Sequence, residues 1–393
     1  MARQKTIRIG GASGFWGDAA LATPQLLAGG DLDYIVYDFL AEVTMAILAR
    51  MWTRDATKGY ASDFVTASMA PNLAEIARQR VRVISNAGGV NPAACAKALR
   101  HEIAGQGLDL KVAYVTGDDL MEKIQSISES APPDMFTGAA FPDPETIGSI
   151  NAYLGAFPIA AALRSGADIV VTGRSVDSAV TLAACIDGFG WREGDLDALA
   201  GGALAGHILE CGTQASGGNF TDWQSVGAGI ANIGYPIAEV AQDGTFTITK
   251  PDGTGGRVSK GTVSEQMLYE IGDPQAYLLP DVACDFSAVE IREVGPDRVQ
   301  VSGAVGHFVP DSYKTCLTWH DGFRSGQLFS FYGADAGAKA TVFADAVLMR
   351  ARAALTGMDV PDFSDTSVEV IGAAPGLPLA HEAVVKIAVR HPQ

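Results

Sequence analysis

The sequence predicts an α/β protein, in which a doubly wound, mainly parallel sheet is followed by a smaller α+β domain. Three observations predict this fold class. Short apolar segments alternate with segments whose apolar residues recur at helical spacing. Turns rich in glycine and polar residues follow the apolar segments, as where a parallel strand passes into a helix. Beyond residue 235 the pattern changes to alternating segments typical of half-buried strands. We therefore expect an α/β domain over residues 1–235 and an α+β domain with a mixed sheet over residues 236–393.

The elements of the first domain follow in order from these patterns. Apolar segments predict strands at Ile7–Gly10, Asp33–Tyr37, Val81–Ser85, Leu110–Val115 and Ile169–Thr172. Helical spacing predicts helices at Gly17–Leu27, Phe39–Met51, Thr66–Gln79, Pro92–Gly105, Ile147–Ser165 and Ser178–Cys185. Another helix is expected to begin at Asp118 or Asp119 and to run through Ile127. Asn91 is expected to cap the helix that begins at Pro92, because proline suits the first helical position.

The second domain is expected to combine strands with two helices. The predicted strands are Phe246–Lys250, Arg298–Ser302, Ser367–Ile371 and Glu382–Arg390. The predicted helices are Val263–Glu270 and Ala334–Thr356. Because the strand Glu382–Arg390 lies so near the end of the chain, we expect it at a sheet edge, where unpaired backbone groups can accept another chain.

Composition and charge exclude several classes of protein. The chain has 393 residues and a formal net charge of −17, so long-range repulsion from phosphates argues against nucleic acid as a partner. No apolar run approaches the roughly 20 residues that span a bilayer, and the N-terminus lacks an apolar signal core. We expect a cytoplasmic protein. Five scattered cysteines and six histidines form no pattern typical of a disulfide framework or a zinc site.

The turn Gly10–Asp18 is the first candidate for ligand binding, because backbone N–H groups at such a turn hold anions. No Walker lysine follows it, and its glycine spacing is not that of a dinucleotide fingerprint. Asp38 nevertheless lies at a strand end about 20 residues further on, so a nicotinamide cofactor stays an alternative. Tight packing of the glycines is the other interpretation. The candidate binding residues of this turn are Gly11, Ser13 and Asp18.

Carboxylates suited to acid–base chemistry follow the strands. Asp38 and Glu42 are four residues apart and therefore share a helix face, although a helix cap and a first-turn acid would explain them equally well. These two residues, with Asp118, Asp119 and Asp177, offer hard oxygen ligands for Mg²⁺. Their spacing alone does not establish a metal site, and we expect neither a metal nor a cofactor.

Two further turns carry groups that bind anions. The turn containing Asn86, Gly88, Gly89 and Asn91 suits an oxyanion or a phosphate, or else it is a plain cap and turn. The segment from Arg174 through Ser175 to Asp177 follows a very apolar strand. Its guanidinium can bind a carboxylate or a phosphate, and a buried structural Arg–Asp pair is the alternative.

The segment 207–220 is the densest polar and glycine-rich stretch after the predicted parallel strands. Glu210 is a candidate general acid or base whose pKa burial would raise. Cys211 is a possible nucleophile, although a lone cysteine is more often a small core residue. Candidate hydrogen-bonding partners of a substrate are Gln214, Ser216 and Asn219. The proline-rich loop 132–144 is expected to be either a lid or a surface connection.

Several long motifs in order resemble the acyclic terpene utilisation AtuA-like family. They are GFWGDAA, DYIVYDFLAEVTMAIL, SNAGGVNP, VTGRSVDSA, ECGTQASGGNF, GGRVSKGTVSEQMLYEIGDP and YLLPDV, and the resemblance covers residues 7 to about 390. The resemblance implies a cytoplasmic protein that is linked to the breakdown of branched acids, which are often bound to CoA. Longer members continue into a ferredoxin-like domain of about 100 residues, which implies a separate small subunit and a hetero-oligomer here.

These observations favour an enzyme, a hydro-lyase (hydratase or dehydratase) that needs no cofactor. Its substrate would be an unsaturated carboxylic acid or its CoA thioester. Glu210 or Asp177 would be the acid or base, Arg174 the carboxylate anchor, and the Gly88–Gly89 turn the oxyanion donor. The alternative is a non-catalytic subunit that binds an acyl-CoA or serves as a scaffold in a degradative complex. A nicotinamide oxidoreductase is a third, weaker interpretation.

Overall fold

The structure is a computed structural model that describes residues 6–18, 20–372 and 381–392. It contains two compact units, Met1–Trp319 and His320–Gln393. The boundary expected at residue 235 therefore lies inside the first unit. The reason is that β7 (Ile237–Ala241), which follows this boundary, pairs antiparallel with β1 (Thr6–Gly11), the first strand of the chain.

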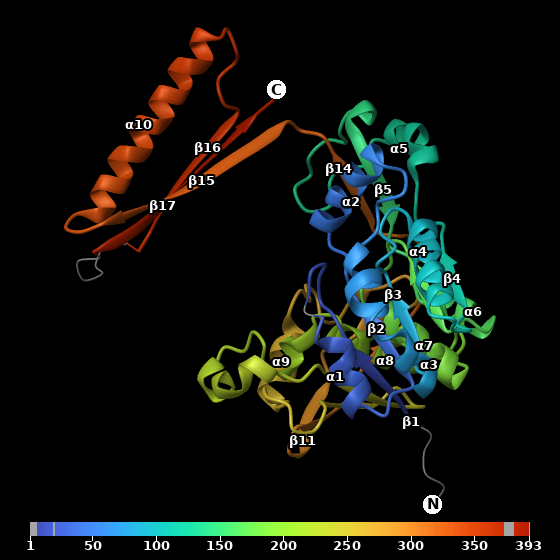
Figure 1. Cartoon of the computed structure of the whole chain (residues 1–393). Helices are drawn as coiled ribbons and strands as arrows, with labels where there is room; N and C mark the ends of the chain where they lie inside the picture. The colour runs from blue at the N-terminus through green and yellow to red at the C-terminus, as the bar shows by residue number, and fades with distance from the viewer. Residues whose placement is uncertain (1–5, 19, 373–380, 393) are drawn as a thin grey trace, which may run out of the picture. The chain divides into compact units, whose positions relative to one another are not determined.

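The first unit is built on a nine-stranded sheet in the order β11-β12-β8-β7-β1-β2-β3-β6-β4 (Figure 1). Five strands are mutually parallel: β1, β2 (Tyr34–Tyr37), β3 (Arg82–Ser85), β6 (Ile169–Thr172) and β4 (Val112–Val115). The remaining four run antiparallel to their neighbours: β7, β8 (Phe246–Thr249), β12 (Arg298–Ser302) and β11 (Glu290–Gly295). The predicted α/β fold class is confirmed.

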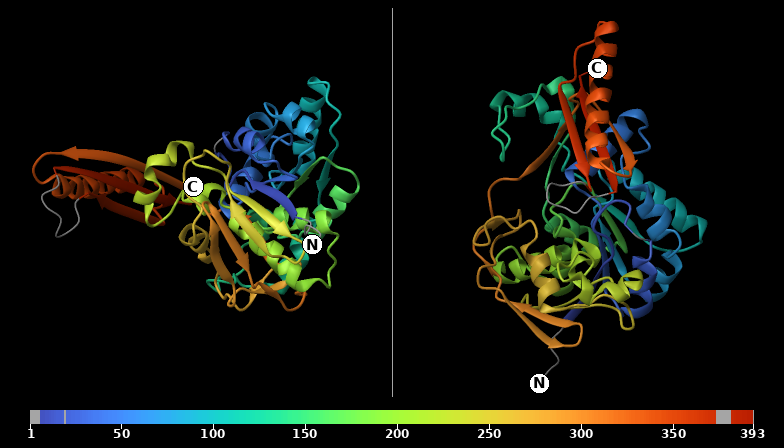
Figure 2. Two further views of the ribbon diagram at one scale, coloured as in Figure 1. Left: turned by 90° about the horizontal axis from the view of Figure 1, so that it is seen from below. Right: turned by 90° about the vertical axis from the view of Figure 1, so that its left-hand side faces the viewer.

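Helices cover both faces of the parallel strands (Figure 2). The helices of the first unit, not all of which lie on this sheet, are α1 (Ala22–Gly29), α2 (Glu42–Arg54), α3 (Leu73–Gln79), α4 (Pro92–Gly105), α5 (Ile124–Ser130), α6 (Phe157–Arg164), α7 (Ala179–Phe189), α8 (Leu196–Leu209) and α9 (Lys260–Leu268). Leu163 of α6, Leu182 of α7 and Leu204 of α8 belong to one core cluster. Leu26 of α1 and Leu99 of α4 belong to another. Burial on both faces explains why the parallel strands are apolar almost throughout.

Some predicted elements differ from the structure, and one helix was not predicted. The helix expected at Ile147–Ser165 begins as strand β5 (Ile147–Ala152), because this segment pairs antiparallel with β14 (Thr315–Trp319), far away in sequence. The helix expected from Thr66 is a π-helical turn, Phe64–Met69, and only then α3. Helix α8 was not predicted, since its glycines weaken the local helical signal. A second small sheet of the first unit contains β9 (Tyr277–Leu278), β10 (Ala283–Asp285) and β13 (Val305–Gly306).

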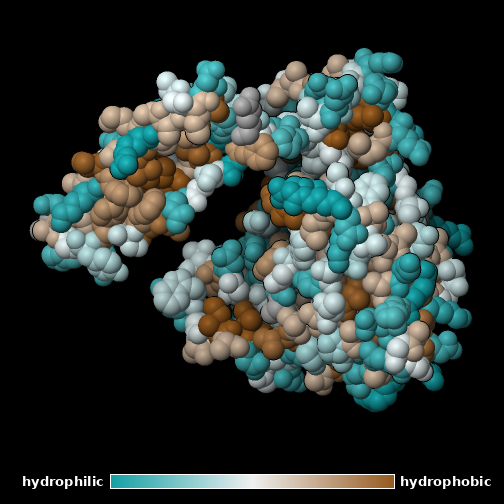
Figure 3. All heavy atoms as spheres, turned by 45° about the horizontal axis from the view of Figure 1, so that its top comes forward, coloured by the Kyte–Doolittle hydropathy of each residue, from teal (hydrophilic) through white to brown (hydrophobic). Residues whose placement is uncertain are grey.

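The second unit is a three-stranded antiparallel sheet with one helix. Its elements are β15 (Phe323–Tyr332), α10 (Ala336–Gly357), β16 (Asp365–Ile371) and β17 (Glu382–His391), and the strand order is β15-β17-β16. The expectation that the last strand lies at an edge is therefore wrong, because β17 pairs with a strand on each side. Ala344 and Leu348 of α10 pack against Val385 and Ile387 on one face of the sheet. Apolar residues also remain on the surface of this unit (Figure 3).

Within the described residues, no helix has both the length and the apolar character that crossing a membrane requires.

The close approach of α8 to the start of α7 yields a stability prediction. A Cβ atom at Gly206 would lie 2.6 Å from the carbonyl oxygen of Ser178, so we expect Gly206→Ala to lower the free energy of unfolding by about 1–3 kcal/mol. Gly105, also helical, has open space at its Cβ position, and Gly105→Ala should be neutral or stabilising by up to ~1 kcal/mol. Urea unfolding followed by circular dichroism measures both. Equal stability of the two variants would contradict this packing.

Candidate functional site

The carboxyl ends of the parallel strands bring the predicted site residues together. Asp38 follows β2, Asn86 follows β3 and Arg174 follows β6, and these strands are neighbours in the sheet. Asn86 donates a side-chain hydrogen bond to Asp38 Oδ1 and accepts one from the backbone N–H of Phe39, at 2.8 Å. Such strand ends are where open α/β sheets bind ligands.

The side chains gathered at these strand ends are called the cluster below. Arg174 is its most deeply buried cation, with an exposed fraction of 2%. Its Nη1 donates to Asp177 Oδ1 at 2.6 Å and to the carbonyl oxygen of Ser175 at 3.1 Å. Its Cζ lies 4.0 Å from the centroid of the Tyr153 ring. The backbone N–H of Arg174 also donates to Asp118, at 2.9 Å. A buried charge requires such partners, since it has lost its hydration.

Asp38 is buried beside this guanidinium and carries a carboxyl group with a raised pKa. Burial raises the pKa most, and the negative charges of Asp177 and Glu210 raise it further. The hydrogen bond from Asn86 and the charge of Arg174 oppose these effects without cancelling them. Asp38 therefore tends to hold its proton where an ordinary aspartate would lose it.

Glu210 and His207 form a buried acid–base pair at the end of α8. His207 Nδ1 lies 2.7 Å from Glu210 Oε1, and Nε2 lies 3.2 Å from the carbonyl oxygen of Met267. Burial raises the pKa of Glu210 to about 7, and the nearby His207 opposes the rise. The pKa of His207 is also raised: burial lowers it, but the charge and hydrogen bond of Glu210, the hydrogen bond to Met267 and the charge of Glu270 together raise it more. The geometry suits a single proton that either side chain can hold.

Glu42 lies at the outer side of the cluster, in the first turn of α2. It accepts a hydrogen bond from the hydroxyl of Tyr153, and its Oε1 lies 3.6 Å from Nζ of Lys314. Burial alone would raise the pKa of Glu42, but the Tyr153 hydrogen bond and the charges of Arg174 and Lys314 hold it below its usual value. Glu42 is therefore a carboxylate that positions Tyr153.

The first glycine turn packs against the end of α8. A Cβ atom at Gly11 would lie 2.8 Å from the carbonyl oxygen of Leu209, and one at Gly14 would lie 2.7 Å from the carbonyl carbon of Cys211. Ser13 Oγ donates to the carbonyl oxygen of Asp38 at 2.9 Å, and Asp18 Oδ2 accepts from the N–H of Gly14 at 3.0 Å. These contacts favour the tight-packing interpretation of the turn.

The turn after β3 has its amide groups engaged. The N–H of Gly88 donates to the carbonyl oxygen of Thr172 at 3.1 Å, and the N–H of Gly89 donates to that of Asn86 at 3.3 Å. Asn91 caps α4 by accepting from the N–H of Ala94, as its position predicted. With both N–H groups engaged, the geometry does not support these glycines as oxyanion donors.

The segment after Glu210 contributes less than its composition suggested. Burial raises the pKa of Cys211 to about 12, so its sulfur is a thiol at neutral pH and is poorly suited to be a nucleophile. The hydroxyl of Ser216 has the backbone carbonyl oxygens of Thr213 and Gly234 within hydrogen-bond distance and donates its one proton to them. Gln214 is half-buried in a 3-10 turn and Asn219 is exposed. Ser175 differs, because its buried Oγ has no hydrogen-bond partner among the described residues.

Three side chains of the cluster were not predicted from the sequence, namely His207, Tyr153 and Lys314. His207 and Glu210 are three residues apart in one helical segment, and this spacing would have revealed the pair. Tyr153 follows β5 and Lys314 precedes β14, so only the pairing of these two distant strands brings them to Glu42. No local pattern in the sequence signals that pairing.

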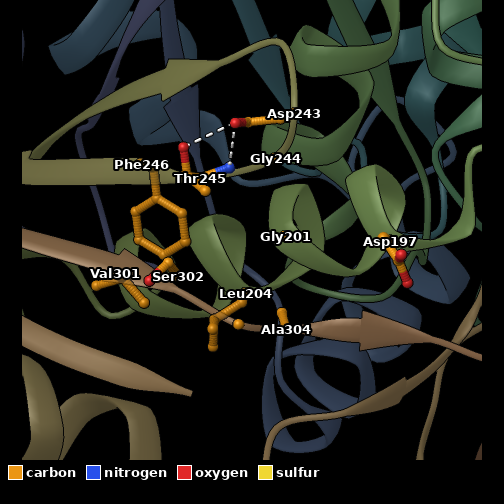
Figure 4. Close-up of a pocket in the computed structure, with 11 residues that line it drawn as sticks. Asp197, Gly201, Leu204, Asp243, Gly244, Thr245, Phe246, Val301, Ser302 and Ala304 are labelled. Carbon is orange, nitrogen blue, oxygen red and sulfur yellow. Dashed lines mark hydrogen bonds between the residues drawn. The ribbon is translucent and has the colours of Figure 1, made fainter. Parts of the chain in front are cut away.

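Other hollows lie elsewhere in the first unit. Figure 4 shows a cavity between α8 and the turn that joins β7 to β8, where Asp243 accepts hydrogen bonds from Thr245. Its volume of about 30 Å³ holds little more than one water molecule. An open groove of about 500 Å³ is lined by residues of α9 and β11. Within the part of the chain that the structure describes, no group of three or more His, Cys, Asp or Glu side chains is arranged to hold a metal ion.

Comparison with known proteins identifies one family. The model of a family described as acyclic terpene utilisation family protein AtuA matches residues 7–393, nearly the whole chain. No curated protein and no solved structure matches the chain.

The raised pKa of Glu210 predicts a pH dependence of stability. Below an unfolded-state pKa of about 4.3 the carboxyl is protonated in both states, and above about 7 it is ionised in both. Between these values the folded state binds more protons, so this group lowers the free energy of unfolding as pH rises. Glu210→Gln should remove that decline, by on the order of 1–3 kcal/mol between pH 5 and 7.5.

Urea unfolding of the wild type and of Glu210→Gln at both pH values measures this difference. The exposed Glu129, in the variant Glu129→Gln, provides the matched control and should leave the decline unchanged. An identical pH dependence in wild type and Glu210→Gln would show that the carboxyl has an ordinary pKa.

Proposed function

Because the chain belongs to the AtuA family of acyclic terpene utilisation, we propose that it is a hydro-lyase acting on an unsaturated branched carboxylic acid or its CoA thioester. One observation carries the proposal. Two buried carboxyl groups with raised pKa values, Asp38 and Glu210, share a cluster with one buried guanidinium, Arg174. This arrangement provides a proton donor, a proton acceptor and a fixed positive charge.

Adding water to a conjugated double bond uses each of these groups. Glu210, with a pKa of about 7, accepts a proton from water as the water oxygen bonds to the β-carbon. Negative charge then develops on the carbonyl oxygen, and the positive charge of the buried Arg174 stabilises it through the field, without direct contact. Asp38 donates its proton to the α-carbon. Proton transfer from Glu210 to Asp38 through solvent restores the starting state, so that one water molecule has been added and nothing else is consumed.

The other predicted acids have supporting roles in this mechanism. Asp177 pairs with Arg174 and fixes the guanidinium, while its charge raises the pKa of Asp38. Glu42 holds the hydroxyl of Tyr153, whose ring in turn contacts Arg174. We therefore assign Asp177 and Glu42 to positioning and reserve proton transfer for Asp38 and Glu210.

Mass spectrometry of branched unsaturated acids and their CoA thioesters, incubated with the chain in heavy-oxygen water, tests the proposal. We expect one compound to gain the mass of one labelled water molecule. Glu210→Gln and Asp38→Asn should each slow this gain by roughly 100-fold or more, because each removes a proton-transfer group. Glu129→Gln should react like the wild type.

Three outcomes separate the interpretations. Full activity of Glu210→Gln would contradict its assignment as the base. In a parallel incubation in D₂O, deuterium exchange at the α-carbon without addition of water would indicate an isomerase. Saturable binding of an acyl-CoA without any change of mass would replace the enzyme with a binding subunit of a degradative complex.

A further inference from the structure

Lys314 is a cation at the outer side of the cluster, and the proposed mechanism assigns it no role. It immediately precedes β14, and its side chain is 42% exposed. Nζ lies 4.7 Å from the centroid of the Tyr153 ring and 5.8 Å from that of Phe136. Its ion pair with Glu42, at 3.6 Å, is longer than a direct hydrogen bond. An ammonium has three N–H donors, and none has a hydrogen-bond partner among the described residues.

Arg174 is poorly placed to bind a substrate's carboxylate. Its side chain is 2% exposed, and its Nη1 already has two acceptors, one of them the carboxylate of Asp177. The same Tyr153 ring contacts both cations, Arg174 in the interior and Lys314 at the surface. A carboxylate that arrives from solvent therefore meets Lys314 before it meets Arg174.

Apolar residues are presented beside Lys314 by an ordered turn. Asp134 accepts hydrogen bonds from the N–H groups of Phe136 and Thr137, at 3.1 and 2.7 Å, and thereby fixes this part of the proline-rich loop. The Phe136 residue is 79% exposed and the neighbouring Met135 is 69% exposed. Large apolar side chains that stay exposed beside a cation suit a ligand with a hydrocarbon part and one negative charge.

The negative charge around Lys314 favours a ligand with one carboxylate over a ligand with several phosphates. The cluster contains the carboxyl groups of Asp38, Glu42, Asp177 and Glu210, and the whole chain carries a net charge of −17. Lys314, whose ion pair with Glu42 is held only at 3.6 Å, can turn toward one added carboxylate. It does not balance the several phosphate charges of CoA, which these carboxylates would repel.

We propose that Lys314 binds the carboxylate of the substrate while Phe136 covers its hydrocarbon part, so that the substrate is a free branched acid and not a CoA thioester. This inference rests on the proposed function and narrows it to one substrate class. It assigns the proline-rich loop as a wall of the substrate site.

Isothermal titration with 3-methylbut-2-enoate, its neutral amide and its CoA thioester tests the inference. The wild type should bind the acid more tightly than the amide or the thioester. Lys314→Gln should weaken binding of the acid roughly 10- to 100-fold, as expected for the loss of one charge-assisted hydrogen bond, and leave binding of the amide unchanged. Lys314→Arg should restore much of the affinity for the acid.

Two further variants sharpen the test. Phe136→Ala should weaken acid and amide alike, because it removes an apolar contact. Lys111→Gln removes an exposed charge just before β4, at the opposite edge of the parallel strands, and should bind like the wild type. Thermal unfolding checks that each variant is folded.

The inference fails if Lys314→Gln binds the acid like the wild type, if the thioester binds more tightly than the acid, or if the wild type binds no acid. Binding and turnover also separate the two proposals. Acid binding that depends on Lys314 without hydration would overturn the hydro-lyase alone, whereas hydration unaffected by Lys314→Gln would overturn only the present inference.

Discussion

The burial of the Arg174 guanidinium is the constraint on which the rest of the site depends. A charge this deeply buried must be paired, and the chain pairs it with the Asp177 carboxylate, a backbone carbonyl oxygen and the face of the Tyr153 ring. The surplus of acids around it has a chemical consequence. Because one guanidinium cannot neutralise Asp38, Asp177 and Glu210 together, burial and mutual repulsion leave Asp38 and Glu210 with raised pKa values. The buried acids thus lower the free energy of unfolding, and the same burial provides a proton donor and a proton acceptor.

The sheet supplies the geometry that this cluster requires. Parallel neighbours β2, β3 and β6 end at one edge and place Asp38, Asn86 and Arg174 side by side. Helix α8 brings Glu210 to the same place, and Gly11 and Gly14 let the first turn approach the backbone of Leu209 and Cys211 on either side of it. The pairing of β5 with β14 then adds Tyr153 and Lys314 at the outer side. A local glycine turn and a pair of strands distant in sequence therefore join the interior acids to the surface cation.

Much of this architecture could be predicted from local patterns, and the remainder depends on distant pairing. The buried strands at Tyr34–Tyr37 and Ile169–Thr172 were predictable because apolar runs before polar turns are a local signal. The Asn91 cap was predictable for the same reason. Strand β5 was mistaken for a helix, and β17 was placed at an edge, because strand pairing is decided by partners far along the chain. The acids were identified as candidates, but their pKa values follow from burial, which composition does not reveal.

The central claim is that Glu210 lies in a buried cluster that holds its carboxyl group partly protonated near neutral pH. Carbon-13 NMR of glutamate carboxyl groups, titrated in the wild type and assigned with Glu210→Gln, measures that pKa directly. The account predicts a carboxyl signal that titrates at about 7 and is missing from the variant. Titration of the Glu210 signal near the ordinary glutamate value of about 4.3 would contradict it.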